Sequence, residues 1–331
     1  MPTSAAPPLG EFALIARYFT HASGERQGVG DDCALIDAGE QTLAITCDLL
    51  AEGIHFFADA DPEALGHKAL AVNLSDLAAA GARPRCFLLG LALPRASAAW
   101  LAAFSHGLMT LAREHRCTLI GGDTTRSAPC PVPGAGGVTI SITAIGEVDR
   151  TRYCGRAGAR PGDDLWVSGS LGEAALAVAL RRGQIALPPP WREACLARLD
   201  RPQPRVDLGR ALAGLATATI DVSDGLCADL GHILERSGVG AQVQWESVPR
   251  AAGFAALDVA LQHRCVLAGG DDYELLFAAP AARRSDVELL GADGVALARI
   301  GTVESEPGLR LRNGGGALIA TTLAGYDHFA G

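Results

Sequence analysis

Aspartates recur in this sequence at the ends of apolar segments, a placement typical of side chains that hold a divalent cation. Asp32 directly precedes one apolar, β-branched-rich run, and Asp48 directly follows the next, with Asp31 as a third acid. The two runs predict a β-hairpin, and because Asp32 and Asp48 are symmetric about Glu40, we expect them to face each other at its open end. A divalent cation would relieve their repulsion there. The alternative is that Asp31 and Asp32 only form the turn that enters the strand.

A fourth acid, Asp76, lies in the second half of a helix predicted over residues 62–80. That half is almost wholly apolar and should be buried, and Asn73 shares a face with Asp76 at a spacing of three residues. A buried aspartate without a partner is costly, so Asp76 either coordinates a metal or joins a hydrogen-bonded network. Metal coordination is favoured, because the sequence has no Arg or Lys three or four residues away.

A glycine-rich acidic motif follows a strand predicted over residues 117–120. It consists of Gly121, Gly122 and Asp123. The glycines would let the backbone approach a ligand closely, and an aspartate directly after a strand could hold a cation. A plain turn is the alternative.

In the second half of the chain, Asp221 and Asp224 lie where a strand predicted over 217–222 gives way to a helix predicted over about 226–236. Such a junction is a favourable place for nucleotide phosphates and their metals, because helix amide groups point toward the ligand. Taken together, the aspartates predict a multi-carboxylate site that binds Mg²⁺ and a polyphosphate.

The elements that position these residues are expected to form two domains. A chain of 331 residues exceeds one ordinary core, and we place the domains at 1–150 and 151–331. The first mixes antiparallel strands with helices, and the second reads as a further unit in which strands and helices alternate, so the fold class is α/β (α+β). The remaining predicted strands are 85–93, 138–148, 164–168, 275–278 and 297–303, and the remaining helices are 11–20, 96–116, 171–182, segments up to 215 and 281–291.

The charge balance limits what the protein binds. Its net charge of −9 at pH 7 disfavours nucleic acid, which is bound by clustered Lys and Arg. Lys68 is the only lysine and follows no glycine-rich loop, so a Walker A phosphate cradle is excluded. Positive charge for phosphates must therefore come from metal ions, backbone amides or arginines such as Arg156 in the Arg- and Gly-rich connector 149–162. The connector arginines could equally be solvated.

Cysteine usage and hydropathy indicate the compartment. Nine cysteines without a CxxC pair argue against a disulfide framework and a zinc knuckle, and most are expected to be small buried apolar side chains. The N-terminus does not read as a signal peptide, and no window approaches a bilayer-spanning apolar run. We therefore expect a cytoplasmic protein that does not bind membranes.

The ordered motifs of the chain resemble those of the thiamine-monophosphate kinase family, within the aminoimidazole-ribonucleotide-synthetase-like superfamily of ATP-dependent enzymes. The resemblance covers nearly the whole chain. Its motifs are EFALIARYF, GDDCAL, TCDLLAEGIHF, KALAVNLSDLAAAGA, LIGGDTTR, RAGARPGD, IDVSDGL, GGDDYELLF and GYDHF. The resemblance implies transfer of the ATP γ-phosphoryl group to thiamine monophosphate, giving thiamine diphosphate.

The resemblance also implies roles for individual residues. Those that would hold several Mg²⁺ ions are Asp32, Thr46, Cys47, Asp48, Asp76, Asp123, Asp221 and Asp224, with backbone carbonyls acting at the two residues that are not acidic. Those that would contact ATP are Gly121, Gly122, Arg156 and Ser223. The thiamine substrate would contact His55, Asp271 and Leu323. The family more often has Glu at position 271 and an aromatic residue at position 323.

The implied fold is two α/β domains, of which the β-rich first domain pairs with its twin in a homodimer. We expect direct in-line transfer with no catalytic side chain, because a phosphate monoester with a second pKa of roughly 6 is mostly dianionic near neutral pH. His55 would then position the substrate. Two alternatives remain, namely another ATP-dependent synthetase of the superfamily and a non-catalytic Mg-nucleotide sensor.

Overall fold

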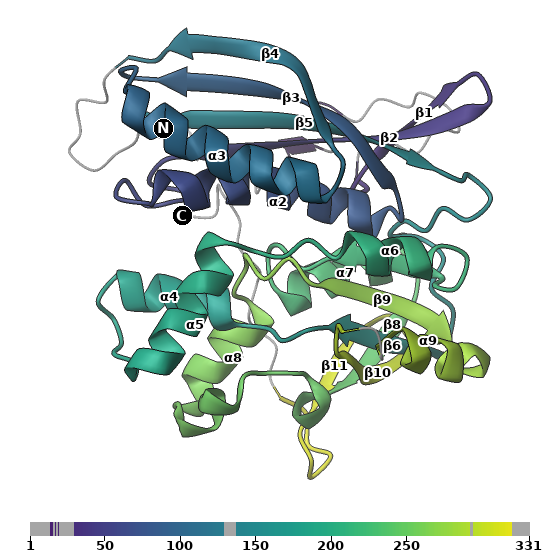
Figure 1. The fold of residues 1–331 in the computed structure, drawn as a ribbon. Helices are drawn as coiled ribbons and strands as arrows, with labels where there is room; N and C mark the ends of the chain where they lie inside the picture. Colours follow the sequence, from purple (N-terminus) through teal and green to yellow (C-terminus); the bar gives the residue numbers. More distant parts are fainter. Residues whose placement is uncertain are drawn as a thin grey trace, which may run out of the picture.

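The chain forms two β-sheets, one in each half (Figure 1). The computed structural model describes residues 14, 15, 17, 19, 30–128, 137–291 and 294–319. Within these ranges no helix is long and apolar enough to cross a membrane. Most of the predicted helix at 11–20 and the whole closing GYDHF motif lie outside the described residues.

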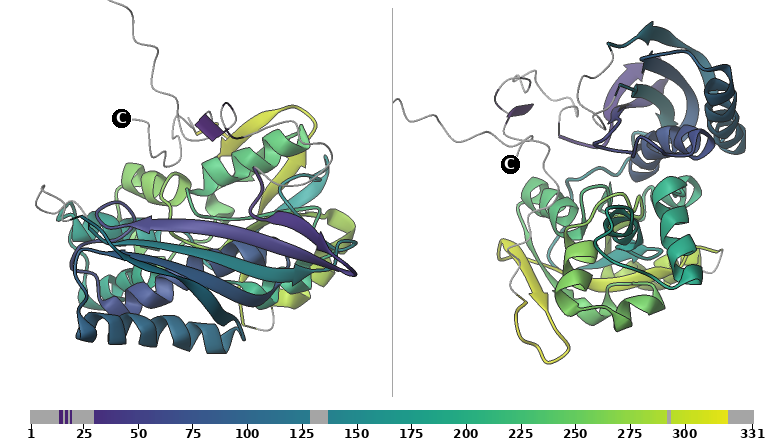
Figure 2. Two further views of the ribbon diagram at one scale, coloured as in Figure 1. Left: turned by 90° about the horizontal axis from the view of Figure 1, so that it is seen from above. Right: turned by 90° about the vertical axis from the view of Figure 1, so that its left-hand side faces the viewer.

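The first sheet has five strands in the order β1-β2-β5-β3-β4, with helices α2 and α3 on one face. Strands β3 and β4 are parallel, and the other neighbours are antiparallel. The elements are β1 (Ala34–Ala38), β2 (Gln41–Ala51), α2 (Pro62–Ala79), β3 (Arg83–Leu93), α3 (Ala98–Glu114), β4 (Thr118–Arg126) and β5 (Thr139–Val148). Seen from above in Figure 2, left, no described helix lies over the other face of this sheet.

The second sheet has six strands in the order β11-β8-β10-β6-β9-β7. Its elements are β6 (Asp163–Ser168), α4 (Glu173–Arg181), α5 (Pro189–Asp200), α6 (Val206–Leu212), β7 (Ala218–Asp221), α7 (Leu226–Ser237), β8 (Gly240–Gln244), α8 (Val259–Leu267), β9 (Leu275–Pro280), α9 (Arg284–Leu290), β10 (Leu297–Glu304) and β11 (Gly308–Arg312), with 3₁₀ turns at Trp245–Ser247, Ala252–Ala256 and Ala281–Arg283. The predicted two-unit mixed α/β fold is confirmed. Strands β8 and β11 and helix α8 were not predicted, because short segments carry little periodicity.

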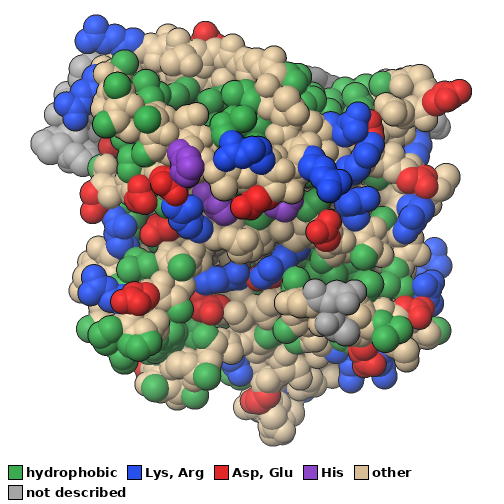
Figure 3. All heavy atoms as spheres, in the orientation of Figure 1, with side chains coloured by type: hydrophobic (Ala, Val, Ile, Leu, Met, Phe, Trp, Pro, Cys, Tyr) green, Lys and Arg blue, Asp and Glu red, His purple; other side chains and the backbone are tan. Residues whose placement is uncertain are grey.

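Helix α2 lies between the two halves of the molecule and is buried on nearly every side. It packs against α3, β2 and β5 of the first half and against α5, α6 and β7 of the second. The apolar sequence predicted this burial, since a helix without a polar face belongs in an interior. One hydrophobic core continues from Leu70 of α2 to Leu212 of α6 and Phe277 of β9. On the outside, the space-filling view shows the halves meeting along a hollowed seam with basic side chains in it (Figure 3).

The predicted hairpin forms, but its register differs by one residue from the prediction. The turn consists of only Gly39 and Glu40, and Gly39 takes a φ of +68°, which a glycine adopts without strain. Continued past the end of β1, the observed register places Cys47 rather than Asp48 opposite Asp32. The predicted symmetry about Glu40 was therefore wrong, because the tight turn contains two residues and has no central one.

Strand β4 continues through the Gly-Gly-Asp motif, which was predicted to follow the strand. Its pairing with β3 skips Ile120, which bulges out and is 58% exposed, and then resumes from Gly121 to Arg126. The glycines do not end the strand, because ladder pairing with β3 extends across them. Asp123 therefore lies within an edge strand and not at a strand end.

Candidate functional site

Three carboxylates from three separate segments meet where the two halves of the molecule join. Asp32 precedes β1, Asp76 lies in α2 and Asp221 ends β7. Each offers one oxygen, and these oxygens lie within 4.8 Å of one another. Asp32 and Asp221 are buried and Asp76 is half-buried. The structure thus brings together three of the aspartates that the sequence singled out, and the site needs both domains.

Hydrogen bonds fix two of these carboxylates. The Thr46 hydroxyl donates to Oδ2 of Asp76, and the Ser75 hydroxyl donates to Oδ2 of Asp221 at 2.5 Å. Thr46 was predicted to act through its backbone carbonyl, but its side chain already orients a member of the cluster. These contacts hold the oxygens in place before any ligand arrives.

The third carboxylate has one oxygen paired and one orphaned. Arg156 donates from Nε and Nη2 to Oδ1 of Asp32, at 3.1 and 2.6 Å. Oδ2 of Asp32 is buried and has no hydrogen-bond partner among the residues that the structure describes. A buried carboxylate oxygen without a partner is costly, and carboxylate oxygens are the ligands that Mg²⁺ prefers. The donor set of this cluster therefore fits a hard divalent cation.

Burial and mutual repulsion oppose ionisation of the cluster. Burial raises the pKa of Asp32 to about 7, with Asp221 and Asp31 adding to the effect and Arg156 opposing it. Burial also raises the pKa of Asp221 to about 6 and raises the pKa of Asp76 well above its usual range. Together these shifts mean that charging all three carboxylates is unfavourable, and that a bound cation would relieve the cost.

Asp48 and Asp224 extend the acidic surface toward an open cleft. The side chain of Asp48 points to the α2 side of the sheet, and its amide donates to Oδ1 of Asn73 at 3.2 Å. Burial raises the pKa of Asp48 to about 6, and the negative charge of Asp224 raises it further. Both acids line a cleft of about 370 Å³ together with His55 and Asp271. A polyphosphate in this cleft would lie beside the three carboxylates that line it, those of Asp48, Asp224 and Asp271.

The loop that carries Asp224 is held by a carboxylate that the sequence analysis missed. Asp229 of α7 is 2% exposed and accepts the amide hydrogens of Ser223, Asp224 and Gly225, each at 3.1 Å. These are the amides at the start of α7 that we predicted to favour a phosphate. They bind the protein's own carboxylate, so Ser223 does not present its amide to a nucleotide. An Asp in the first helical turn is the only local sign of this role.

Asp123 is not brought to the cluster. It is exposed. Across the sheet, Asp123 of β4 pairs with Gly90 of β3, Gly90 pairs with Ser141 of β5, and Ser141 pairs with Leu49 of β2. Residues in register share a face, so Asp123 lies on the outer face with Leu49, opposite the face to which Asp48 points. Three strand spacings separate β2 from β4, which is about 14 Å.

Three other residues predicted to bind metal or ATP also lie on the first sheet and away from the acidic cluster. The Cys47 side chain is exposed on the outer face, where Thr143 donates to its sulfur at 3.4 Å. Gly121 and Gly122 are exposed on β4 beside Asp123. Within one chain, these residues do not meet the other predicted ATP contacts, Arg156 and Ser223.

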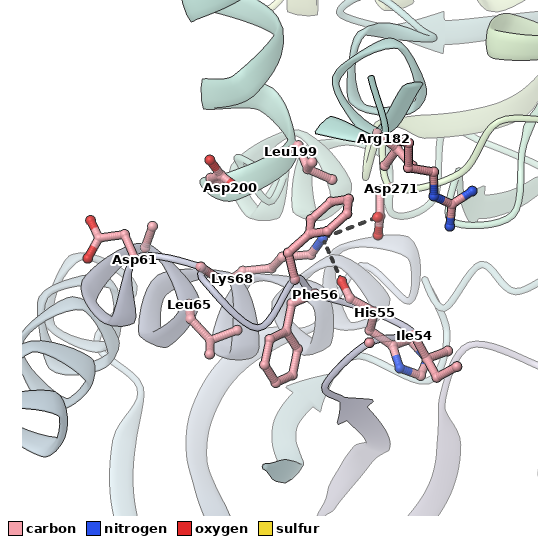
Figure 4. Close-up of a pocket in the computed structure, with 15 residues that line it drawn as sticks. Ile54, His55, Phe56, Asp61, Leu65, Lys68, Arg182, Leu199, Asp200 and Asp271 are labelled. Carbon is pink, nitrogen blue, oxygen red and sulfur yellow. Dashed lines mark hydrogen bonds and ion pairs between the residues drawn. The ribbon is translucent and has the colours of Figure 1, made fainter. Parts of the chain in front are cut away.

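The predicted substrate contacts His55 and Asp271 do come together across the two halves (Figure 4). Nδ1 of His55 accepts the Ala51 amide hydrogen at 3.0 Å. Asp271 accepts from Nζ of Lys68 at 3.1 Å and from the hydroxyl of Tyr273 at 3.0 Å. The third predicted contact, Leu323, lies outside the described residues.

Two family models match the chain. The N-terminal domain of AIR synthase related protein matches residues 30–148, and the C-terminal domain of AIR synthase related protein matches residues 160–313. Curated thiamine-monophosphate kinases are similar along nearly the full length. The Salmonella typhimurium protein is 41% identical over 330 residues, covering 97% of this chain and 98% of its own, and the protein of Escherichia coli strain K12 is 40% identical over 331 residues with the same coverage.

Solved structures give the same likeness. Thiamine-monophosphate kinase from Stenotrophomonas maltophilia K279a is 42% identical, covers 92% of this chain and 97% of its own, and superposes with a TM-score of 0.77. AaThiL complexed with AMPPCP and TMP is 30% identical, covers 99% of this chain and 100% of its own, and has a TM-score of 0.83. The HypE–HypF complex contains a chain of 18% identity with a TM-score of 0.75, a likeness of fold alone.

Proposed function

The chain belongs to the thiamine-monophosphate kinase family, and from this premise we propose that the acidic cluster between its two domains is a magnesium centre for phosphoryl transfer. The enzyme phosphorylates thiamine monophosphate to thiamine diphosphate with ATP as co-substrate. The observation that carries the magnesium assignment is the meeting of three carboxylates within 4.8 Å, one of them with an orphaned buried oxygen.

Asp32, Asp76 and Asp221 would hold one part of a group of Mg²⁺ ions, and Asp48 and Asp224 would extend it into the cleft. When bound, the ions would neutralise the repulsion between the two anionic phosphates and align donor with acceptor. The protein's own contribution is to fix the carboxylates, through the Thr46, Ser75 and Asp229 contacts described above.

Arg156 supplies the positive charge that the missing Walker lysine would give. Its guanidinium is largely buried and pairs with Oδ1 of Asp32, one of the proposed magnesium ligands. A cation bound by Asp32 would take over the neutralisation of that carboxylate. Arg156 could then direct its paired donors to an ATP phosphate, which matches guanidinium geometry as a carboxylate does.

We further propose that the transfer is direct and uses no protein general base. The acceptor phosphate is mostly ionised near neutral pH, because its second pKa is roughly 6. The geometry at His55 agrees with this, since Nδ1 accepts a backbone hydrogen and the neutral ring therefore carries its proton on Nε2, a tautomer inferred from that bond. A neutral ring whose Nδ1 lone pair accepts a backbone hydrogen and whose Nε2 carries the proton has no lone pair left with which to remove a proton.

The experiment is turnover with a stereochemical readout. Incubation with thiamine monophosphate, Mg²⁺ and ATP carrying a chiral, isotopically labelled γ-phosphate should give ADP and thiamine diphosphate in equal amounts, with inverted configuration at phosphorus. Net retention would contradict direct transfer, because a covalent phosphoenzyme inverts twice. ADP release without thiamine diphosphate would contradict the assigned acceptor.

We also propose that the protein is a homodimer that pairs through the outer face of the first sheet. No described helix covers this face, and it exposes large apolar side chains, namely Ile36, Leu49, Leu88 and Ile120, at 38–58%. An exposed apolar face of this kind is typical of an interaction surface. Asp123 lies on the same face and cannot join the cluster of its own chain, so in the dimer it would act in the site of the second copy.

Mixing two inactive variants tests this arrangement. Asp76→Asn and Asp123→Asn should each be inactive alone, whereas subunit exchange should restore about a quarter of the sites, because half of the dimers are mixed and one of their two sites is intact. If Asp123 acted within its own chain, both sites of a mixed dimer would be damaged and the mixture would stay inactive. Full activity of Asp123→Asn alone would remove this residue from the site, and sedimentation as a monomer would contradict the dimer.

A further inference from the structure

The single lysine of the sequence lies in the wall between the two domains, beneath the substrate cleft. Lys68 is in the second turn of α2, and its side chain is 4% exposed. Its ammonium donates to Oδ2 of Asp271 at 3.1 Å and to the backbone carbonyl of His55 at 3.5 Å (Figure 4). These partners are the two described residues assigned to the acceptor substrate, one from each domain. Lys68 therefore contacts both sides of the proposed substrate site at once.

The partner in the second domain is held in an unusual backbone conformation. Asp271 has a φ of +69° and Tyr273 a φ of +51°, in the left-handed region that residues other than glycine rarely adopt. The Asp271 amide donates to the Ser223 carbonyl at 2.9 Å, and the Tyr273 hydroxyl donates to Oδ1 of Asp271 at 3.0 Å. Such a conformation persists only where the surroundings fix it. Of the three contacts to Asp271 named here, from Ser223, Tyr273 and Lys68, only that from Lys68 comes from the first domain.

The ion pair also lies where two cavities meet. One is the acidic cleft that contains Asp48, and the other is a smaller cavity of about 60 Å³ lined by Phe56, Leu65 and Leu199. His55 and Asp271 line both cavities. A substrate with an anionic phosphate and a large organic part would place its phosphate on the acidic side and its rings toward this boundary. A carboxylate whose charge is balanced by Lys68 would offer the rings a fixed hydrogen-bond acceptor.

We propose that Lys68 is a positioning residue for the acceptor substrate, because it fixes the Asp271 carboxylate and the His55 turn in one arrangement across the domain boundary. This inference rests on the proposed function. It assigns to Lys68 no contact with the reacting phosphates. Its effect should therefore fall on thiamine monophosphate binding and not on ATP binding.

Steady-state kinetics of Lys68→Met distinguish positioning of the acceptor substrate from a general loosening of the contact between the two domains. The variant should raise the KM for thiamine monophosphate by about tenfold or more and change the KM for ATP by less than about twofold. Lys68→Arg, which keeps the charge, should recover part of the loss. Glu63→Gln is the matched control. Among the described residues it removes the other ion pair from α2 to the second domain, the 3.0 Å pair with Arg201, and it should leave both KM values unchanged.

Two kinetic results would overturn the proposal. One is an equal rise of both KM values in Lys68→Met, and the other is the same acceptor-specific rise in Glu63→Gln. The unaltered enzyme is assayed first, so a failure of the proposed function appears as absence of turnover in that sample. An unaltered enzyme that turns over beside an unaffected Lys68→Met overturns only the role of Lys68.

A spectroscopic test uses the unaltered chain and stays decisive if Lys68→Met does not fold. Because the sequence has one lysine, ¹⁵N-lysine labelling places a single labelled ammonium group in the protein. Thiamine monophosphate should shift that resonance, whereas a non-hydrolysable ATP analogue with Mg²⁺ should shift it much less. Asp271→Asn should shift it without any ligand. A resonance that does not respond to saturating thiamine monophosphate would overturn the proposal.

Discussion

Asp76→Asn is expected to lower kcat by about a hundredfold or more and, in the absence of metal, to make the protein more stable at pH 8. The loss of activity follows because one ligand of the proposed magnesium centre loses its charge. The gain in stability follows because burial, together with the charges of Asp48 and Asp221, raises the pKa of Asp76 well above its usual range. The wild-type fold must therefore hold an unfavourable charge at high pH.

The sign of the pH dependence follows from proton binding. Between the unfolded pKa of roughly 3.9 and its raised folded value, Asp76 binds more protons in the folded state, so wild-type stability falls as pH rises through this window. Thermal unfolding in EDTA at pH 5 and pH 8 should show the variant's advantage only at the higher pH, and Mg²⁺ should stabilise the wild type more than the variant. Asp207→Asn, which alters a fully exposed carboxylate on α6, is the control. A variant that keeps its activity, or is less stable than wild type in EDTA at pH 8, would contradict the assignment.

Arg156→Met is expected to have the opposite effect on stability. It leaves Asp32 buried without its counter-charge, which should cost about 3 kcal/mol of unfolding free energy at pH 8 without metal. The cost should shrink at pH 5, because burial raises the pKa of Asp32 to about 7 and the acid is then mostly protonated. The variant should also raise the KM for ATP, since paired guanidinium donors to a phosphate are lost.

Mg²⁺ separates the two roles of Arg156. Saturating Mg²⁺ should restore most of the lost stability, because the cation compensates Asp32, but it should leave the KM for ATP high. Denaturant unfolding with and without Mg²⁺, together with steady-state kinetics, measures both effects. Arg150→Met is the matched control, as it removes an exposed arginine of the same connector that pairs with Asp37 on the surface. Unchanged ATP kinetics in Arg156→Met would show that the arginine serves only the acidic cluster.

The core of the acidic site could be predicted from the sequence because each member has a local sign. Asp32 and Asp221 sit at the ends of apolar strands, and Asp76 interrupts an apolar helix. Asp123 carried the same sign but lies within an edge strand on the other face. The difference is the bulge at Ile120 and the pairing that follows it, and both depend on β3, not on the motif itself.

The residues that the sequence did not reveal act through distant partners. Lys68 pairs with a carboxylate 203 positions later in the chain, and Ser75 bonds to Asp221 at a separation of 146. Neither distance leaves a pattern in a single sequence. The hairpin shows a second limit of prediction from sequence. A turn that is one residue longer or shorter moves every side chain of the second strand to the opposite face of the sheet, and composition does not determine the length of the turn.

The position of α2 has a consequence for how the protein reaches its native state. This helix has apolar side chains on all sides, so the first domain alone would leave one side of α2 exposed to water. We infer that docking of the second domain completes the folding of the first and is not a later association of two finished units. Asp221 arrives in that same event and meets Asp32 and Asp76 there, so the repulsion between the acids opposes the last stage of assembly. Dissolved magnesium would then control not only catalysis but also how fast the newly made chain becomes native.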